Sequence, residues 1–195
     1  MNAPIVTPEL KTLLRQVKLG RCLDTLPERL ALAHTGGLGH AEFLELVLAD
    51  EVSRRETTSA DRRGHAAGLD PTMTLDRWDD TTKITYDRAI WNELCSLRFI
   101  DGGHNAVIMG PVGVGKTFLA NALGHAAIRR RYSVHFERCD RLLQRLRASR
   151  LDNSHDTEIR KLLRVDLLVI DLCRGGNYAD RGCRVAAVRW GFSGS

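Results

Sequence analysis

The fold of this chain is decided by one stretch of sequence, Gly110-Pro111-Val112-Gly113-Val114-Gly115-Lys116-Thr117. It matches the pattern G-x-x-x-x-G-K-S/T of a P-loop, in which backbone N–H groups of a glycine-rich turn point toward phosphate oxygens. The Lys116 ammonium is suited to the β- and γ-phosphates, and the Thr117 hydroxyl is suited to a bound Mg²⁺. The stretch therefore predicts a site for ATP and Mg²⁺ at residues 110–117, with Lys116 as a catalytic group.

The residues on either side supply the context that this motif requires. Residues 105–109 form a short apolar run, Asn-Ala-Val-Ile-Met, which is typical of a buried parallel strand. After the loop, apolar residues recur at the i, i+3, i+4, i+7 spacing of a helix with one buried face: Leu119, Ala122, Leu123 and Ala126. The alternative, a glycine-rich turn that binds nothing, is disfavoured by this order of strand, loop and helix.

Strands and helices continue to alternate after the P-loop helix. Residues 132–136 (Tyr-Ser-Val-His-Phe) predict a second strand, and residues 166–171 (Asp-Leu-Leu-Val-Ile-Asp) predict a third. Between them, Asp140 is a candidate N-cap for a leucine-rich helix. This alternation predicts an α/β fold of the P-loop NTPase type, with a parallel sheet and helices on both of its faces.

Asp171 closes the third strand and is the second candidate site residue. An acidic side chain at the end of a buried apolar strand costs free energy unless it has a partner or a ligand. In P-loop proteins a carboxylate at this place holds Mg²⁺ directly or through water. The pattern thus favours Asp171 as a metal-binding and catalytic residue beside Thr117. An aspartate that caps a helix or turn beyond the strand is the alternative.

The N-terminal part of the chain predicts helices followed by a connection. Thr7 is a candidate N-cap with Pro8 at the first helical position, and residues 36–39 (Gly-Gly-Leu-Gly) interrupt the helical pattern. Residues 57–83 are rich in Thr, Asp, Gly and Arg and contain Pro71, which is typical of an irregular connection. We therefore expect a helical N-terminal region at 1–70, a linker at 71–84, a P-loop core at 85–171 and a separate tail at 172–195.

Composition narrows the class of protein. Hydrophobic residues make up 43% of the 195 residues, which is enough for a core, and the net charge is +5. The five cysteines show no C-x-x-C spacing and the seven histidines show no metal-ligand spacing, so neither a disulfide framework nor a zinc site is indicated. The polar N-terminus lacks the pattern of a signal peptide, and no apolar run approaches the roughly 20 residues of a membrane span. These features predict a cytoplasmic protein without a membrane partner.

The positive charge is concentrated in one region. Between Arg129 and Arg164 there are eleven Arg or Lys residues and five Asp or Glu residues. Arg129, Arg130 and Arg131 end the P-loop helix, where cations complement the helix dipole. A second group follows, made up of Arg138, Arg141, Arg145, Arg147 and Arg150. Arg141 and Arg145 are spaced i, i+4 on the next helix, and an exposed arginine row without matching acids would bind DNA phosphates. A merely solvated face explains the same charges equally well.

Taken together, these residues make the chain resemble the IstB family, the helper ATPases of insertion sequences, which are related to DnaC-type helicase loaders. The resemblance covers roughly residues 8–171 and is carried by the segments 38–44, 51–56, 97–100, 110–120 and 163–171. It implies an AAA+-like ATPase core that follows a helical DNA-binding region. It also implies binding of ATP, assembly of several copies on double-stranded DNA, and cooperation with the transposase of the same element.

The departures from the family pattern affect the expected activity. The family has a second acidic residue directly after the position of Asp171, where this chain has Leu172, and residues 172–195 show no likeness to it. We interpret the chain as a C-terminally truncated or frameshifted copy. We expect nucleotide binding with weak or absent hydrolysis, and a sheet whose lost strands expose an edge or an apolar face. The alternatives are a non-catalytic nucleotide- and DNA-binding remnant and a helicase loader.

Overall fold

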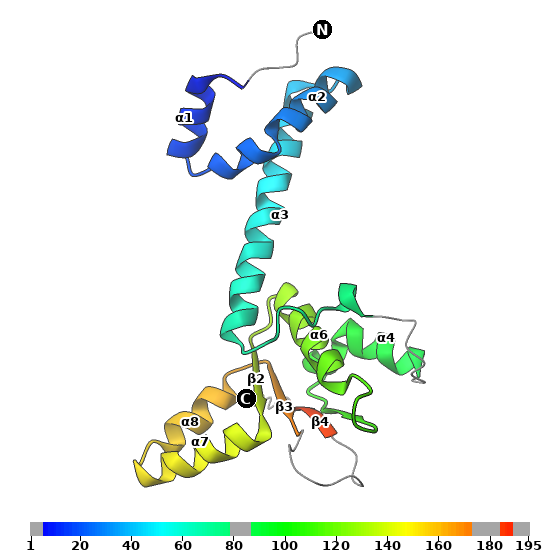
Figure 1. The fold of residues 1–195 in the computed structure, drawn as a ribbon, viewed down its shortest axis with the longest axis vertical. Coiled ribbons are helices and arrows are strands. Elements are labelled where there is room, and N and C mark those ends of the chain that lie inside the picture. The colour runs from blue at the N-terminus through cyan, green and yellow to red at the C-terminus, as the bar shows by residue number, and fades with distance from the viewer. Residues whose placement is uncertain (1–5, 79–86, 173–183, 189–195) are drawn as a thin grey trace. The chain divides into compact units, whose positions relative to one another are not determined.

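The chain folds into two compact units in a computed structural model that describes residues 6–78, 87–172 and, as backbone only, 184–188. The first unit covers residues 1–59 and the second covers residues 60–195. Figure 1 shows a helical first unit and a second unit in which helices surround a sheet. The boundary lies before the end expected for the helical region, residue 70, because Ala67 and Leu69 are buried in the core of the second unit.

The first unit is built from α1 (Pro8–Gln16), the 3-10 turn η1 (Gly20–Asp24), α2 (Leu26–Gly36) and the beginning of α3 (His40–Ala66). The predicted cap is confirmed, since the Thr7 hydroxyl accepts a hydrogen bond from the Leu10 N–H at 3.3 Å and Pro8 opens the helix. Its core is small and centres on Cys22, Leu26 and Val47.

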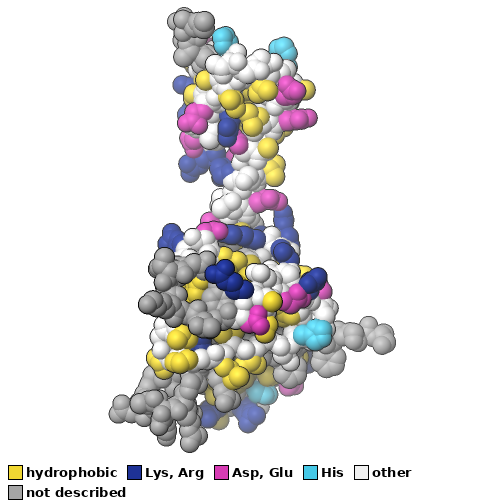
Figure 2. Space-filling view, turned by 90° about the vertical axis from the view of Figure 1, so that its right-hand side faces the viewer, with side chains coloured by type: hydrophobic (Ala, Val, Ile, Leu, Met, Phe, Trp, Pro, Cys, Tyr) yellow, Lys and Arg dark blue, Asp and Glu magenta, His cyan; other side chains and the backbone are white. Residues whose placement is uncertain are grey.

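Many large apolar side chains of this unit remain at the surface, where Figure 2 shows them in yellow. α1 buries none of its residues, and Leu13 and Val17 are 57% and 61% exposed. Leu44 and Val52 of α3 are 55% and 56% exposed. The small core leaves the first unit dependent on polar contacts between its elements.

One polar contact of the first unit is built on a buried carboxylate of α3. Glu51 is only 4% exposed and accepts hydrogen bonds from Arg54 at 2.7 Å and from Arg55 at 2.6 Å. Arg55 also donates to the Lys18 carbonyl at 2.7 Å, which joins α3 to the segment after α1. The hydrogen bond from Arg54, aided by Arg55 and opposed by burial, lowers the pKa of Glu51 from 4.5 to about 2.

The expected irregular connection at residues 57–83 is wrong for its first part, because α3 continues to Ala66. Thr57 and Thr58 do not break the helix, since their hydroxyls donate to the carbonyls of Ser53 and Arg54 one turn earlier. After α3, the described residues up to 78 contain only the short turn η2 (Leu75–Arg77). Residues 79–86 of the expected linker lie outside the described residues.

The second unit contains the predicted sheet. After α4 (Arg88–Ser96) and α5 (Arg98–Asp101) come β1 (Ala106–Met109), α6 (Lys116–Arg129), β2 (Val134–Arg138), α7 (Cys139–Leu151), α8 (His155–Leu163), β3 (Leu167–Asp171) and β4 (Arg184–Val188). The strand order is β1-β4-β3-β2. β2 and β3 pair in parallel, and β4 is antiparallel to both β1 and β3. The three predicted strands therefore share one direction, as expected, and β4 runs against them.

Helices cover both faces of this sheet, which confirms the predicted α/β layers (Figure 1). Leu167 and Val169 of β3 belong to the core beneath α6, together with Leu123 and Ile128. Leu168 lies on the opposite face, packed with Leu142 of α7 and Leu162 of α8. α7 begins at Cys139, so Asp140 lies in its first turn and is not the N-cap that the sequence predicts.

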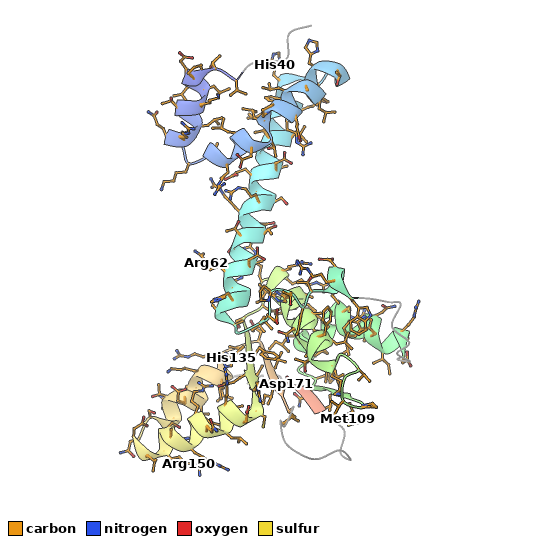
Figure 3. All side chains as sticks on the ribbon, viewed as in Figure 1. His40, Arg62, Met109, His135, Arg150 and Asp171 are labelled. Carbon is orange, nitrogen blue, oxygen red and sulfur yellow. The ribbon has the colours of Figure 1, made fainter. Side chains whose placement is uncertain are left out.

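β4 comes from the tail that was expected to be separate, and it fills the position between β1 and β3. The expected exposure of an edge or apolar face is nevertheless found at β1, an edge strand of the described sheet. Val107 and Met109 are 57% and 66% exposed, and Figure 3 labels Met109 at this edge.

The Glu51 contact predicts how the first unit responds to acid. A carboxylate whose pKa is lowered on folding stabilises the fold fully above its unfolded pKa and loses that effect as the pH falls through its folded pKa. Glu51→Gln is expected to lower the free energy of unfolding by about 1–3 kcal/mol at pH 7, and by less between pH 4.5 and pH 2, where the wild-type contribution fades.

The measurement is urea unfolding of the wild type and the variant at pH 7 and pH 3. Glu45→Gln changes an exposed carboxylate on the same helix and serves as the control. An equal loss at both pH values would show that the charge of Glu51 does not contribute in this way.

Candidate nucleotide-binding site

The P-loop connects the end of β1 to the first turn of α6. Gly113 and Gly115 have φ angles of 86° and 84°, a left-handed conformation that residues with a Cβ rarely adopt. Gly115 lies directly before the first residue of α6, so the loop passes into the positive end of a helix dipole. This is the backbone arrangement that the glycines of the motif predict.

Lys116 and Asp171 are both buried although the surrounding sheet is apolar. Their exposed fractions are 5% each. The Lys116 ammonium donates a hydrogen bond to the Pro111 carbonyl, across the loop. The Thr117 hydroxyl donates to an Asp171 carboxylate oxygen at 3.1 Å, although the two residues are 54 positions apart in sequence. The structure thus brings Thr117 of the predicted P-loop into contact with Asp171, the second candidate site residue.

The shared direction of the strands explains this meeting. β1 and β3 both run opposite to β4, so their carboxyl ends lie at one edge of the sheet. The P-loop follows β1 and Asp171 ends β3, and Figure 3 shows Asp171 at this edge. Ligands of α/β proteins bind beyond the carboxyl ends of parallel strands.

These residues fit a magnesium nucleotide. A buried ammonium, a hydroxyl and a buried carboxylate on one loop and one strand supply a cation for phosphate oxygens and oxygen ligands for a hard metal ion. Bound Mg²⁺ would neutralise charge on the phosphates. Thr117 and Asp171 would hold it, and Lys116 with the backbone of residues 110–117 would hold the phosphates. Leu172, directly after Asp171, offers no second carboxylate.

Sequence reasoning missed two residues next to this site. Asn121 is 1% exposed, and its amide donates to the Thr117 carbonyl at 2.8 Å. Trp78 lies against Phe118, with ring centroids 5.3 Å apart. A signal existed for Asn121, because it interrupts an apolar run in which polar residues would be buried. The sequence held no comparable signal for Trp78, which is distant along the chain.

The expected arginine row without matching acids is wrong for two of its members. Arg145 is half-buried and is bound by Glu137 of β2 and, at 2.6 Å, by Glu158 of α8. The hydrogen bond from Lys161, ahead of that from Arg145, lowers the pKa of Glu158. Arg138 pairs with Asp140 at 3.0 Å. Arg145 therefore joins β2, α7 and α8, and the acids that match it come from neighbouring elements.

Other classes of site receive no support within the described residues. Over residues 6–78 and 87–172, no group of three His, Cys, Asp or Glu side chains could hold a metal ion. Cys22, Cys95 and Cys139 are unpaired. None of the described helices combines the length and the apolar character that crossing a bilayer requires.

Comparison with known proteins gives a consistent result. Residues 12–176 match the family described as IstB-like ATP binding protein. The chain is 38% identical over 167 residues to an ATP-binding protein in an insertion sequence of Mycobacterium tuberculosis, a match that covers 86% of this chain and 66% of the relative.

Two pseudomonad relatives match over similar lengths. An ATP-binding protein of insertion sequence IS1162 from Pseudomonas fluorescens is 35% identical, with 81% of this chain and 69% of the relative covered. An ATP-binding protein of insertion sequence IS21 from Pseudomonas aeruginosa is 31% identical, with 84% of this chain and 62% of the relative covered. The chain thus spans about two thirds of the length of these relatives.

The contact between Thr117 and Asp171 predicts a metal-dependent part of nucleotide affinity. Asp171→Asn keeps the shape of the side chain but removes the charge that would hold Mg²⁺. Affinity for ATP is expected to fall about 10- to 100-fold in the presence of Mg²⁺ and to change little in EDTA. Isothermal titration calorimetry in both buffers measures this. Asp156→Asn, on the exposed surface of α8, is the control, and an equal loss in EDTA would contradict the metal role.

Proposed function

The chain belongs to the IstB-like ATP-binding protein family, and on this premise we propose that it is a nucleotide-dependent, DNA-binding helper of insertion-sequence transposition. In this proposal it binds ATP with Mg²⁺, assembles on double-stranded DNA as a homo-oligomer and assists the transposase of the same element. The observation that carries the nucleotide part is the hydrogen bond between Thr117 and Asp171, two residues that the P-loop chemistry requires at one place.

The DNA-binding part is supported by cations that remain available at the surface. Lys11 and Arg15 lie one turn apart on α1, and Lys18 follows its end. All three are exposed and form no ion pair with any described residue. Arg29 is different, because it is bound by Asp50 at 2.6 Å. Unpaired cations on one short helix are suited to the closely spaced phosphates of duplex DNA.

A second group of available cations lies on α7. Arg141, Arg147 and Arg150 are exposed and have no ionic partner among residues 6–78 and 87–172, whereas Arg145 is held by acids. We propose that these three arginines, and not the whole row, contact the phosphates of DNA. They would bind backbone phosphates without reading a base sequence.

Hydrolysis is proposed to be slow. The transfer of a phosphoryl group requires a positioned water and neutralisation of the charge that develops, and an arginine from a neighbour contributes about 10³- to 10⁵-fold in well-studied P-loop enzymes. Leu172 cannot orient a water beside Asp171. This residue favours the second candidate, a nucleotide and DNA binder that does not turn over. A helicase loader would differ from a transposition helper by its protein partner.

DNA binding with ATP provides the test. We expect ATP to tighten binding of the wild type to duplex DNA, and the logarithm of the affinity to fall linearly with the logarithm of salt concentration. Fluorescence anisotropy between about 50 and 200 mM salt measures both. Lys116→Ala should remove the effect of ATP and leave the salt dependence. Salt-independent binding would refute the proposed DNA contact.

The contact surface can be located by the same measurement. Replacing Lys11, Arg15 and Lys18 together with alanine should reduce the salt slope by about one unit for each lost phosphate contact. The corresponding variant of Arg141, Arg147 and Arg150 tests α7. Arg88→Ala, an exposed arginine at the start of α4, is the control that should leave the slope unchanged.

A further inference from the structure

A segment outside the P-loop motif runs along the helix that follows it. We call residues 69–78 the strap. The strap begins where Leu69 packs on Gly124 of α6, so closely that a Cβ at Gly124 would lie 2.7 Å from a Leu69 methyl carbon. It ends at Trp78, beside the loop itself. Figure 1 shows this segment crossing α6 directly after α3.

Polar contacts hold the strap along α6. The Asp70 N–H donates to the side-chain oxygen of Asn121 at 2.9 Å, and the Asp70 carbonyl contacts a ring nitrogen of His125 at 2.8 Å. Further along, Arg129 donates to Asp76 at 3.3 Å. Both backbone groups of Asp70 are therefore fixed by side chains of α6, which sets the position of the strap relative to that helix.

Trp78 occupies the space that a side chain at Gly115 would fill. A Cβ built on Gly115 would lie 3.1 and 3.2 Å from two carbons of the Trp78 ring. The same ring packs on Phe118, with an angle of 49° between the ring planes. Two constraints therefore favour glycine at position 115: its φ of 84° is unfavourable for other residues, and the Trp78 indole leaves little room for a Cβ.

Asn121 forms a second link between the strap and the site. Its oxygen accepts from the strap at Asp70, and its nitrogen donates to the carbonyl of Thr117 at 2.8 Å. Thr117 in turn donates its hydroxyl to Asp171. One fully buried amide thereby connects the strap to the residue proposed to hold Mg²⁺, and an unsatisfied replacement at this position would be costly.

We propose that Trp78, with Asn121, is a positioning residue for nucleotide binding: the indole holds Gly115 and Phe118 in the conformation in which the loop accepts phosphates. A glycine-rich loop populates many backbone conformations, and each one excluded before binding reduces the entropy lost when the phosphates bind. The strap therefore supplies preorganisation that the motif alone lacks. This inference rests on the proposed nucleotide binding and adds a residue to it.

The first test compares affinities for ADP measured by calorimetry. Trp78→Ala is expected to weaken ADP binding about 10-fold, and Trp78→Phe, which retains an aromatic ring, by less than about 3-fold. Trp91→Ala is the matched control, because it removes an indole that packs on the core of the same unit. It should lower the melting temperature and leave the affinity for ADP within about 3-fold of the wild type. Wild-type affinity in Trp78→Ala would overturn the inference.

The second test separates positioning from general stability. ADP raises the melting temperature of a protein that binds it in the folded state. In Trp78→Ala this rise should shrink, whereas in Trp91→Ala it should persist from a lower starting temperature. A lowered melting temperature in Trp78→Ala with an undiminished ADP-induced rise would mean that Trp78 is only structural, and the inference would fail.

A third measurement uses the wild-type side chain and avoids destabilised variants. With Trp91 and Trp190 replaced by phenylalanine, Trp78 is the only tryptophan in the sequence. Saturating ADP should shift its fluorescence emission, and Lys116→Ala in the same background should abolish the shift. An ADP complex detected by calorimetry without any change in Trp78 emission would count against contact with the loop. Absence of ADP binding in the wild type would instead overturn the proposed function.

Discussion

The structure depends on keeping two charged side chains, Lys116 and Asp171, out of water within an apolar sheet. Burial of an unpaired carboxylate or ammonium is so costly that such groups persist only with partners or a ligand. Asp171 has the Thr117 hydroxyl, and Lys116 has the Pro111 carbonyl. The contact between Thr117 and Asp171 requires β1 and β3 to end at the same edge of the sheet, so both strands have to run in the same direction. When a nucleotide binds, phosphate oxygens could replace the Pro111 carbonyl as the partner of Lys116, and a metal ion could bind to Asp171. Interactions between opposite charges are stronger than the present hydrogen bonds to neutral groups.

On the face of the sheet that α7 and α8 cover, a charged side chain is held by ion pairs. There Arg145 is neutralised by Glu137 and Glu158, and the group joins a strand to two helices. Losing Arg145 would leave Glu158 with Lys161 and Glu137 with His135, but it would break the link from α7 to β2 and α8. Arg145 therefore contributes to the fold more than to any surface. The cations available for a polyanion are consequently fewer than the composition suggests. The cations proposed to bind DNA lie on α1, directly after it, and on α7.

The sequence predicted the part of this structure that follows from local patterns. A P-loop with an apolar strand before it and an amphipathic helix after it is compatible with few folds. Asp171 was recognised because burial of a carboxylate costs free energy unless the group has a partner or a ligand. The length of α3 was missed because threonines such as Thr57 satisfy their hydroxyls within a helix. The pairing of Arg145 was missed because its acids lie 8 and 13 residues away and meet it only after β2 and α8 pack. Trp78 reaches Gly115 from outside the motif, so only tertiary structure reveals it.

The strand β4 has a consequence for the order in which this molecule acquires its site. The strands that carry the P-loop and Asp171 are hydrogen-bonded to each other only through β4 in the described sheet. During synthesis, β1, α6, β2 and β3 emerge first, yet the hydrogen bonds that link β1 to β3 through β4 cannot form before residues 184–188 are made. Such late, non-local pairing slows folding. The nascent chain therefore contains the whole P-loop motif before β4 can fix the P-loop and Asp171 relative to each other.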